Sequence, residues 1–199
     1  MRTRREDIGG LGNLLFKEAY IWAQMRDGDI PDVYVQSTKY WRKYKEEIRQ
    51  RFSHGIGNKT VPFVAVHIRR GDYLKATQFH VPLWDTDYYK KALMLFPNDK
   101  FMVFCRDNQN KTIDAADREW CKEFMTNLVG VDRFVLNPND MKETEDLNML
   151  ASCKSLIGAN SSFSWWGAFL GNHEKIVFPK SWFTDGFQRT ELLDEWTLI

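Results

Sequence analysis

The fold is decided by Val61-Pro62-Phe63-Val64-Ala65-Val66-His67-Ile68, a run that is apolar almost throughout. Such a run is typical of a strand that is buried on both faces of a sheet. Shorter apolar runs follow it over residues 101–105, 133–136, 156–159 and 176–178. We therefore expect further strands at these four places.

Between the strands, apolar residues recur every three or four positions, which is the period of a helix with one buried face. Helices are expected over residues 86–96, 114–128, 144–152 and 162–170, and before the first strand over 13–24 and 37–52. Strands that alternate with helices predict an α/β fold with a parallel sheet covered on both sides. In such sheets, ligands bind beyond the carboxyl ends of the strands.

The composition excludes several classes of protein. Of the 199 residues, 43% are hydrophobic and 15% aromatic, which suffices for a core and excludes wholesale disorder. The formal net charge of +1 argues against a general nucleic-acid-binding protein. Neither the three cysteines nor the four histidines are spaced like the ligands of a metal site, and no disulfide framework is expected.

Targeting signals are not evident in the sequence. No apolar stretch approaches the roughly 18–20 residues that span a bilayer. The charged start, residues 1–6, has no apolar stretch behind it and so does not form a signal peptide. We therefore expect a soluble, cytoplasmic protein with reduced cysteines.

The first candidate site is His67-Ile68-Arg69-Arg70-Gly71-Asp72-Tyr73, directly after the first strand. It places two guanidinium groups at the ligand edge of the sheet, and arginine matches phosphate oxygens with paired hydrogen bonds. Asp72 could orient one arginine or accept a hydrogen bond from a ligand. Two alternatives stay open: an ion pair that binds no ligand, and, more remotely, an adhesion motif at Arg70-Gly71-Asp72.

The second candidate site is Asn160-Ser161-Ser162-Phe163-Ser164-Trp165-Trp166, which leads from a strand into a helix. Hydroxyl groups and backbone N–H groups at a helix N-terminus can hold a phosphate, and the helix dipole favours the negative charge. The alternative is an ordinary serine cap. A third candidate is Glu145-Asp146, which either complements a helix dipole or accepts hydrogen bonds from a guanine edge.

A glycine-rich stretch, Gly9-Gly10-Leu11-Gly12-Asn13-Leu14, lies near the N-terminus. It lacks the third glycine of a dinucleotide-binding motif, and no strand is expected before it. The chain also has no G-x-x-x-x-G-K-[ST] motif, which argues against a nucleotide triphosphatase.

Together these motifs resemble the α-1,2-fucosyltransferases, the family typified by galactoside 2-fucosyltransferases. Residues 67–73 look like the family's H-x-R-R-G-D-Y, and residues 145–166 look like its E-D-L…C…N-S-S-F-S-W-W. Further matches, in the same order along the chain, are Gly9–Asn13, Gln36–Trp41 and Pro179–Phe183.

The resemblance implies a Rossmann-like parallel sheet of the GT-B type. A complete GDP-sugar-binding lobe would cover residues 58–199, and a reduced, mostly helical acceptor-side lobe would cover 1–57. The implied reaction moves L-fucose from GDP-fucose to a galactose 2-hydroxyl of a glycan acceptor with inversion, and it needs neither a metal nor another cofactor. No nucleic acid and no membrane segment are expected. As a fragment of an anchored animal-type enzyme, the chain would instead lie in the Golgi lumen.

The resemblance also implies roles for single residues. Arg69 would grip the β-phosphate, with His67 and Arg70 in support, and Asp72 is the candidate general base. Asn13 would reach the diphosphate or the fucose. Asp146 would read guanine. The residues that would bind the diphosphate through hydroxyls and backbone are Ser161, Ser162, Phe163 and Ser164.

The chain departs from the family pattern at several places. Leu14 stands where the family has Gln, and Cys105-Arg106-Asp107 stands where relatives have Ser-Asp-Asp. Asn13 and His67 also lie much closer in sequence than in the family. A second hypothesis therefore stays open, in which the chain is a remnant that binds a GDP-sugar without transferring it.

Overall fold

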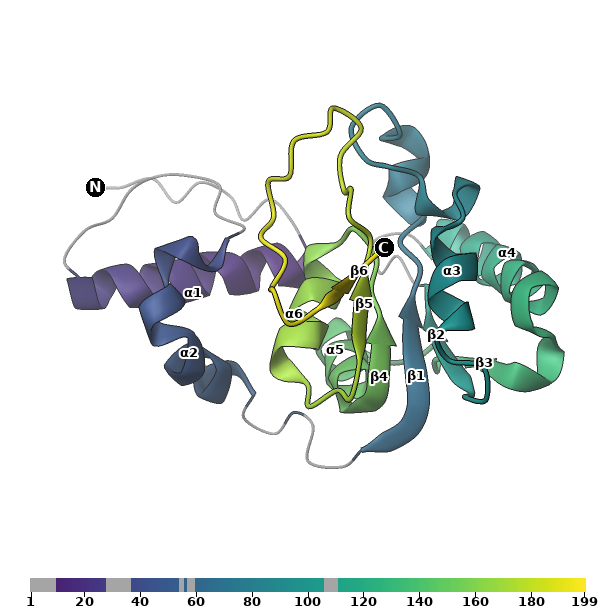
Figure 1. Ribbon diagram of the computed structural model, residues 1–199, viewed down its shortest axis with the longest axis horizontal. Coiled ribbons are helices and arrows are strands. Elements are labelled where there is room, and N and C mark those ends of the chain that lie inside the picture. The colour runs from purple at the N-terminus through teal and green to yellow at the C-terminus, as the bar shows by residue number, and fades with distance from the viewer. Residues whose placement is uncertain (1–9, 28–36, 54–55, 57–59, 106–110) are drawn as a thin grey trace.

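The computed structural model describes residues 10–27, 37–53, 56, 60–105 and 111–199. Six strands form one open, all-parallel sheet in the order β3-β2-β1-β4-β5-β6 (Figure 1). The strands are β1 (Val61–His67), β2 (Phe101–Phe104), β3 (Phe134–Leu136), β4 (Cys153–Ile157), β5 (Ile176–Phe178) and β6 (Thr197–Leu198). The expected α/β, Rossmann-like parallel sheet is confirmed, whereas the two-lobed GT-B arrangement stays a prediction.

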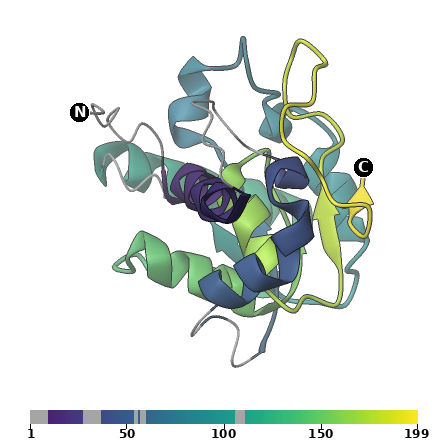
Figure 2. The ribbon, with the colours of Figure 1, turned by 90° about the vertical axis from the view of Figure 1, so that its left-hand side faces the viewer.

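The helices cover both faces of this sheet (Figures 1 and 2). One face packs against α1 (Leu11–Asp27), α2 (Lys45–Phe52), α5 (Glu143–Ser152) and α6 (Ser162–Leu170). The other packs against α3 (Tyr88–Met94) and α4 (Lys111–Val129). Successive residues of β1 alternate between the two cores: Ala65 belongs to the first, and Val64 and Val66 belong to the second.

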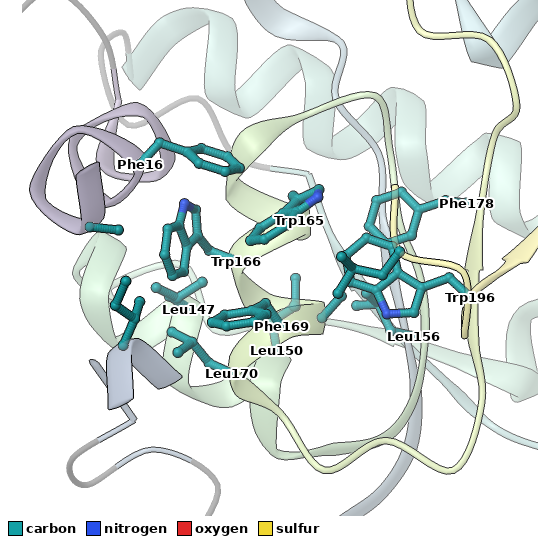
Figure 3. Close-up of a cluster of buried hydrophobic side chains, with 14 of the residues drawn as sticks. Phe16, Leu147, Leu150, Leu156, Trp165, Trp166, Phe169, Leu170, Phe178 and Trp196 are labelled. Carbon is teal, nitrogen blue, oxygen red and sulfur yellow. The ribbon is translucent and has the colours of Figure 1, made fainter. Parts of the chain in front are cut away.

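Helix α6 lies at the centre of the first core. Its residues Trp165, Trp166 and Phe169 are buried among aromatic rings from other elements (Figure 3). Phe16 of α1 lies 4.6 Å from Trp165 between ring centroids, and Trp41 stacks on Trp166 at 5.9 Å. The N-terminal helices therefore share one core with α6. The division of the chain into lobes at residue 57 stays a prediction.

A close approach between α1 and α6 explains one glycine of the N-terminal motif. A Cβ atom at Gly12 would lie 2.4 Å from the carbonyl carbon of Ser162, closer than real side chains come. Gly12 therefore lets the start of α1 pack directly on the start of α6.

Some expected boundaries are wrong. The strand expected over 156–159 runs instead from Cys153 to Ile157. Its start was not expected because Lys154 and Ser155 interrupt the apolar run. The single helix expected over 37–52 divides into two 3₁₀ turns, Thr38–Tyr40 and Arg42–Tyr44, followed by α2. The expected strands did not include β6, which has only two residues.

The remaining short elements are 3₁₀ helices at Gly71–Lys75, Leu83–Asp85 and Val131–Arg133. Gly9, Gln36, the Arg106-Asp107 pair and most of the expected boundary at 54–58 lie outside the described residues. Within the described ranges, no helix is both long and apolar enough to cross a membrane.

Candidate functional site

Two turns meet where the strand order reverses. The first turn, residues 68–75, follows β1, and the second turn, residues 158–163, follows the adjacent β4. The Tyr73 hydroxyl donates a hydrogen bond to the carbonyl oxygen of Asn160 at 3.0 Å, and the His67 ring lies 5.4 Å from the Phe163 ring. The structure thus brings the first two candidate sites together at the sheet edge where parallel α/β folds bind ligands.

Arg69 is the accessible arginine of the first turn. Its side chain is 24% exposed, and its Nη2 atom lies 2.7 Å from Oδ1 of Asp72, whose side chain is 56% exposed. The guanidinium group also lies 5.3 Å from the centre of the Tyr73 ring. Because an exposed ion pair contributes little stability, Arg69 could exchange Asp72 for a phosphate at small cost.

Arg70 faces the protein instead. It forms an ion pair with the buried carboxylate of Asp117 on α4, and its guanidinium carbon lies 4.5 Å from the centre of the Trp120 ring. Asp117 also accepts a hydrogen bond from the Gly71 N–H at 2.7 Å. Arg70 therefore fixes the shape of the first turn, and direct contact between Arg70 and a phosphate stays a prediction.

Asp117 is a site residue that the sequence analysis missed. It occupies an inward position on α4 in line with Trp120 and Cys121, and an aspartate on such a face needs a buried partner. An aspartate on the buried face of this helix could have indicated a buried ion pair, but the sequence does not show that its partner is Arg70.

His67 ends β1 and is almost fully buried, with 4% of its surface exposed. Burial, helped by the charge of Arg69, lowers the pKa of His67 to about 3, so the imidazole is neutral near pH 7. Its Nδ1 atom has no hydrogen-bond partner among the described residues. A buried polar atom without a partner costs about 1–3 kcal/mol, which a ligand atom could recover.

Hydrogen bonds within the second turn fix its shape. The Ser161 hydroxyl accepts a hydrogen bond from the Phe163 N–H at 3.3 Å and caps α6. The buried Ser164 hydroxyl lies 3.1 Å from the Ala159 nitrogen and 3.1 Å from the carbonyl oxygens of Ala159 and Ser161. Ser164 thus holds the turn from within, and diphosphate binding by Ser161, Phe163 and Ser164 stays a prediction.

Three helices begin next to this turn. The Ser162 hydroxyl donates a hydrogen bond to Asn13 Oδ1 at 2.8 Å, which places the start of α1 beside the start of α6. The Leu11 N–H donates to Oε1 of Glu143, the first residue of α5, at 3.0 Å. The N-termini of three helices therefore lie in one region of the molecule, where helix dipoles are positive. Asn13 thus contacts the serine-rich turn, and its contact with the diphosphate or the fucose stays a prediction.

Asp146 lies in the first turns of α5 and is buried, with 4% of its surface exposed. Its carboxylate accepts a hydrogen bond from Nδ2 of Asn137 at 2.8 Å, and Oδ1 of Asn137 accepts one from Arg118 at 3.1 Å. The guanine-reading role of Asp146 stays a prediction. Glu145 caps its own helix by accepting the Lys142 N–H at 2.6 Å, in agreement with the plainer interpretation of that residue.

Metal ligands do not gather in the part of the chain that the structure describes: no group of three or more His, Cys, Asp or Glu residues there could hold an ion. Positive charge at the site comes from Arg69 and from the helix N-termini.

Comparisons with known proteins point to one family. The sequence model of Glycosyl transferase family 11 matches residues 32–199. An alpha-1,2-colitosyltransferase of Escherichia coli is 30% identical over 175 residues, which cover 79% of this chain and 56% of the relative. The galactoside 2-alpha-L-fucosyltransferase Sec1 of Mus musculus is 26% identical over 211 residues, 89% of this chain and 55% of the relative.

A third relative is the O-antigen biosynthesis glycosyltransferase WbnK of Escherichia coli, 30% identical over 138 residues, 66% of this chain and 43% of the relative. The chain thus spans about half the length of the curated relatives it matches. No solved structure matches the chain.

Proposed function

The chain belongs to glycosyl transferase family 11, and on this premise we propose that it transfers L-fucose from GDP-fucose to the 2-hydroxyl of a galactose-containing glycan. The transfer inverts the configuration at the anomeric carbon. It proceeds without a metal ion.

One observation carries this proposal: the turns after β1 and β4 touch each other, through Tyr73 with Asn160 and through His67 with Phe163. Arg69 and the N-terminus of α6 can therefore act on the same ligand. When the bond between fucose and GDP breaks, negative charge develops on the diphosphate. A guanidinium group and helix N-termini placed beforehand at that position stabilise the charge as it forms.

Donor binding links Arg69 to the proposed base. The diphosphate draws the Arg69 guanidinium away from Asp72, its partner at 2.7 Å in the free protein. Asp72 is then free to accept the proton that the acceptor hydroxyl loses. His67, neutral because burial lowers its pKa to about 3, offers its unpartnered Nδ1 to the donor without adding charge.

A second candidate donor is supported by the relatives. The colitosyltransferase named above is 30% identical over 79% of this chain. Colitose differs from fucose in lacking the 3-hydroxyl group, so both donors present the same GDP to the two turns. A comparison of the two donors at equal concentration identifies the sugar.

The test measures binding by calorimetry and transfer with a panel of galactosides in the presence of EDTA. Arg69→Ala is expected to weaken GDP-fucose binding by at least about 1.5 kcal/mol, the scale of lost charge-assisted hydrogen bonds. Arg51→Ala, which changes an exposed arginine on α2, is the matched control and should bind normally.

Unchanged affinity in Arg69→Ala would remove that residue from the site. Equal binding of GDP and ADP would contradict guanine recognition. Binding of GDP-fucose without transfer to any acceptor would favour the alternative of a donor-binding remnant.

A further inference from the structure

Five side chains next to the site contact one another in succession and form what we call the column. The Arg69 guanidinium lies 5.3 Å from the centre of the Tyr73 ring, and that ring stacks on His80 at 4.1 Å with 12° between their planes. His80 in turn lies 5.3 Å from Phe183, and the Arg189 guanidinium lies 4.8 Å from the centre of the Phe183 ring. The column thus begins and ends with an arginine, and Arg69, which the site uses, is one of them.

The column joins two segments that are far apart in sequence. His80 and Phe183 form an antiparallel bridge, and the Thr184 N–H donates a hydrogen bond to the Phe79 carbonyl oxygen at 3.1 Å. Arg189 pairs with Asp185, with Nη1 to Oδ1 at 3.1 Å and Nη2 to Oδ2 at 2.5 Å. The far end of the column is therefore an ion-paired arginine, and its near end contacts Arg69 through the Tyr73 ring.

His80 is the imidazole of the column, and it gains a positive charge only when the pH falls below the ordinary histidine range. Its Nδ1 is buried and has no hydrogen-bond partner among the described residues. Burial lowers the pKa of His80 most; the Asp72 carboxylate raises it, and the charges of Arg69 and Arg189 lower it. A protonated His80 would place a third cation between two arginines in a single stack.

We propose that His80 is a positioning residue for Arg69: the neutral ring completes the stack that directs the Arg69 guanidinium toward the donor diphosphate, and protonation loosens the stack. The inference rests on the proposed function, because its readout is donor binding. Donor affinity should therefore fall as the pH drops below the ordinary histidine range.

The experiment measures GDP-fucose binding by calorimetry at pH 7.5 and 5.5. GDP-fucose suits this test because both of its phosphates are esterified and neither titrates in that range. We expect His80→Ala to weaken binding at pH 7.5 by about five- to tenfold, the scale of a lost aromatic and cation–π stack. His80→Phe should recover most of that loss and, having no titrating group, should remove the extra weakening that the natural protein shows at pH 5.5.

A change at Arg189 separates titration of His80 from a merely structural role. If His80 acted only through packing, the variant would not change the pH dependence of donor affinity. Arg189→Gln removes the far cation, whose charge lowers the pKa of His80, so the pH at which donor affinity begins to fall should rise. The matched control is Arg51→Gln, for which that pH should not change. Melting temperatures at both pH values confirm that each variant is folded.

The outcomes separate the two proposals. Natural protein that fails to bind GDP-fucose at pH 7.5 overturns the proposed function and this inference with it. Natural protein that binds the donor, while His80→Phe loses affinity at pH 5.5 as steeply as the natural protein does, overturns the positioning role alone. So does a His80→Ala variant that binds as tightly as the natural protein at both pH values.

Discussion

The two turns that meet at the site are stabilised in different ways. The second turn, after β4, is shaped mainly by its own serines, because Ser161 caps α6 and Ser164 bonds back to Ala159. Asn160 also ties this turn to the carbonyl oxygens of Val81 and Trp182. The first turn, after β1, depends on groups far along the chain, such as Asp117 on α4. The comparison teaches that a charged turn can take its shape from a remote helix, whereas a serine-lined helix start is shaped largely by its own hydroxyl groups.

The largest effect is expected when the remote anchor of the first turn is removed. Asp117→Ala leaves Arg70 without its buried partner and the Gly71 N–H without its acceptor. Breaking a buried ion pair by removing one partner costs about 3–5 kcal/mol, which we expect in the free energy of unfolding in urea. Asp132→Ala, at an exposed aspartate, is the control, and equal stability of the two variants would show that the first turn needs no anchor.

The next effect concerns His67 at the base of the first turn. Burial lowers its pKa from 6.5 to about 3, so the folded state binds the proton less well than the unfolded state does. The contribution of His67 to the free energy of unfolding is therefore fully present above pH 6.5 and is lost as the pH falls toward about 3. At pH 4.5 the loss should be about 2–3 kcal/mol relative to pH 7.

Urea unfolding at a series of pH values measures this loss. His67→Gln removes the titrating group and should flatten the dependence of stability on pH between 7 and 4.5. If the variant and the natural protein lose stability in parallel over this range, His67 is not the group responsible.

A smaller effect tests the contact that α1 makes with the second turn. Gly12→Ala forces a Cβ atom to within 2.4 Å of the Ser162 backbone, so α1 must move away from α6. Overpacking of this kind costs about 1–3 kcal/mol of stability. The control is Gly10→Ala, because a Cβ atom there meets nothing closer than Glu143 Oε1 at 3.4 Å. Equal melting temperatures for the two alanine variants would contradict the close approach.

The smallest effect is expected within the second turn. Ser164→Ala removes a buried hydroxyl that accepts the Ala159 N–H at 3.1 Å. Leaving that buried donor without an acceptor should cost about 1–2 kcal/mol in the free energy of unfolding. Ser181→Ala, at an exposed serine, should leave stability within about half a kcal/mol of the natural value. A Ser164→Ala variant as stable as Ser181→Ala would show that the turn does not depend on its own hydroxyls.

The sequence predicts features that depend on neighbouring residues better than features that depend on remote ones. The run over residues 61–68 predicts β1, because a strand covered on both faces must be apolar over its whole length. The start of α6 is equally evident, because a serine cap acts over two residues. The orientation of Arg70 is not evident, since it depends on Asp117, which lies on a helix far along the chain.

The same limit applies to Asp146, whose partner Asn137 follows β3. The sequence also does not show where β4 begins or that β6 exists. The start of β4 carries Lys154, and β6 has two residues, so neither shows the apolar pattern that marks a buried strand. Local periodicity predicts elements, whereas the pairing of charged side chains is a property of the assembled fold.

The burial of α6 has a consequence for protein engineering. Every residue from 165 to 170 is buried, so a library that randomises this part of the helix would mainly return unfolded clones. Variation aimed at a new donor or acceptor belongs instead at exposed positions within 74–79 and 187–188, beside Arg69 and Arg189. The helix whose N-terminus we propose to face the donor is thus the part of the molecule least open to directed evolution.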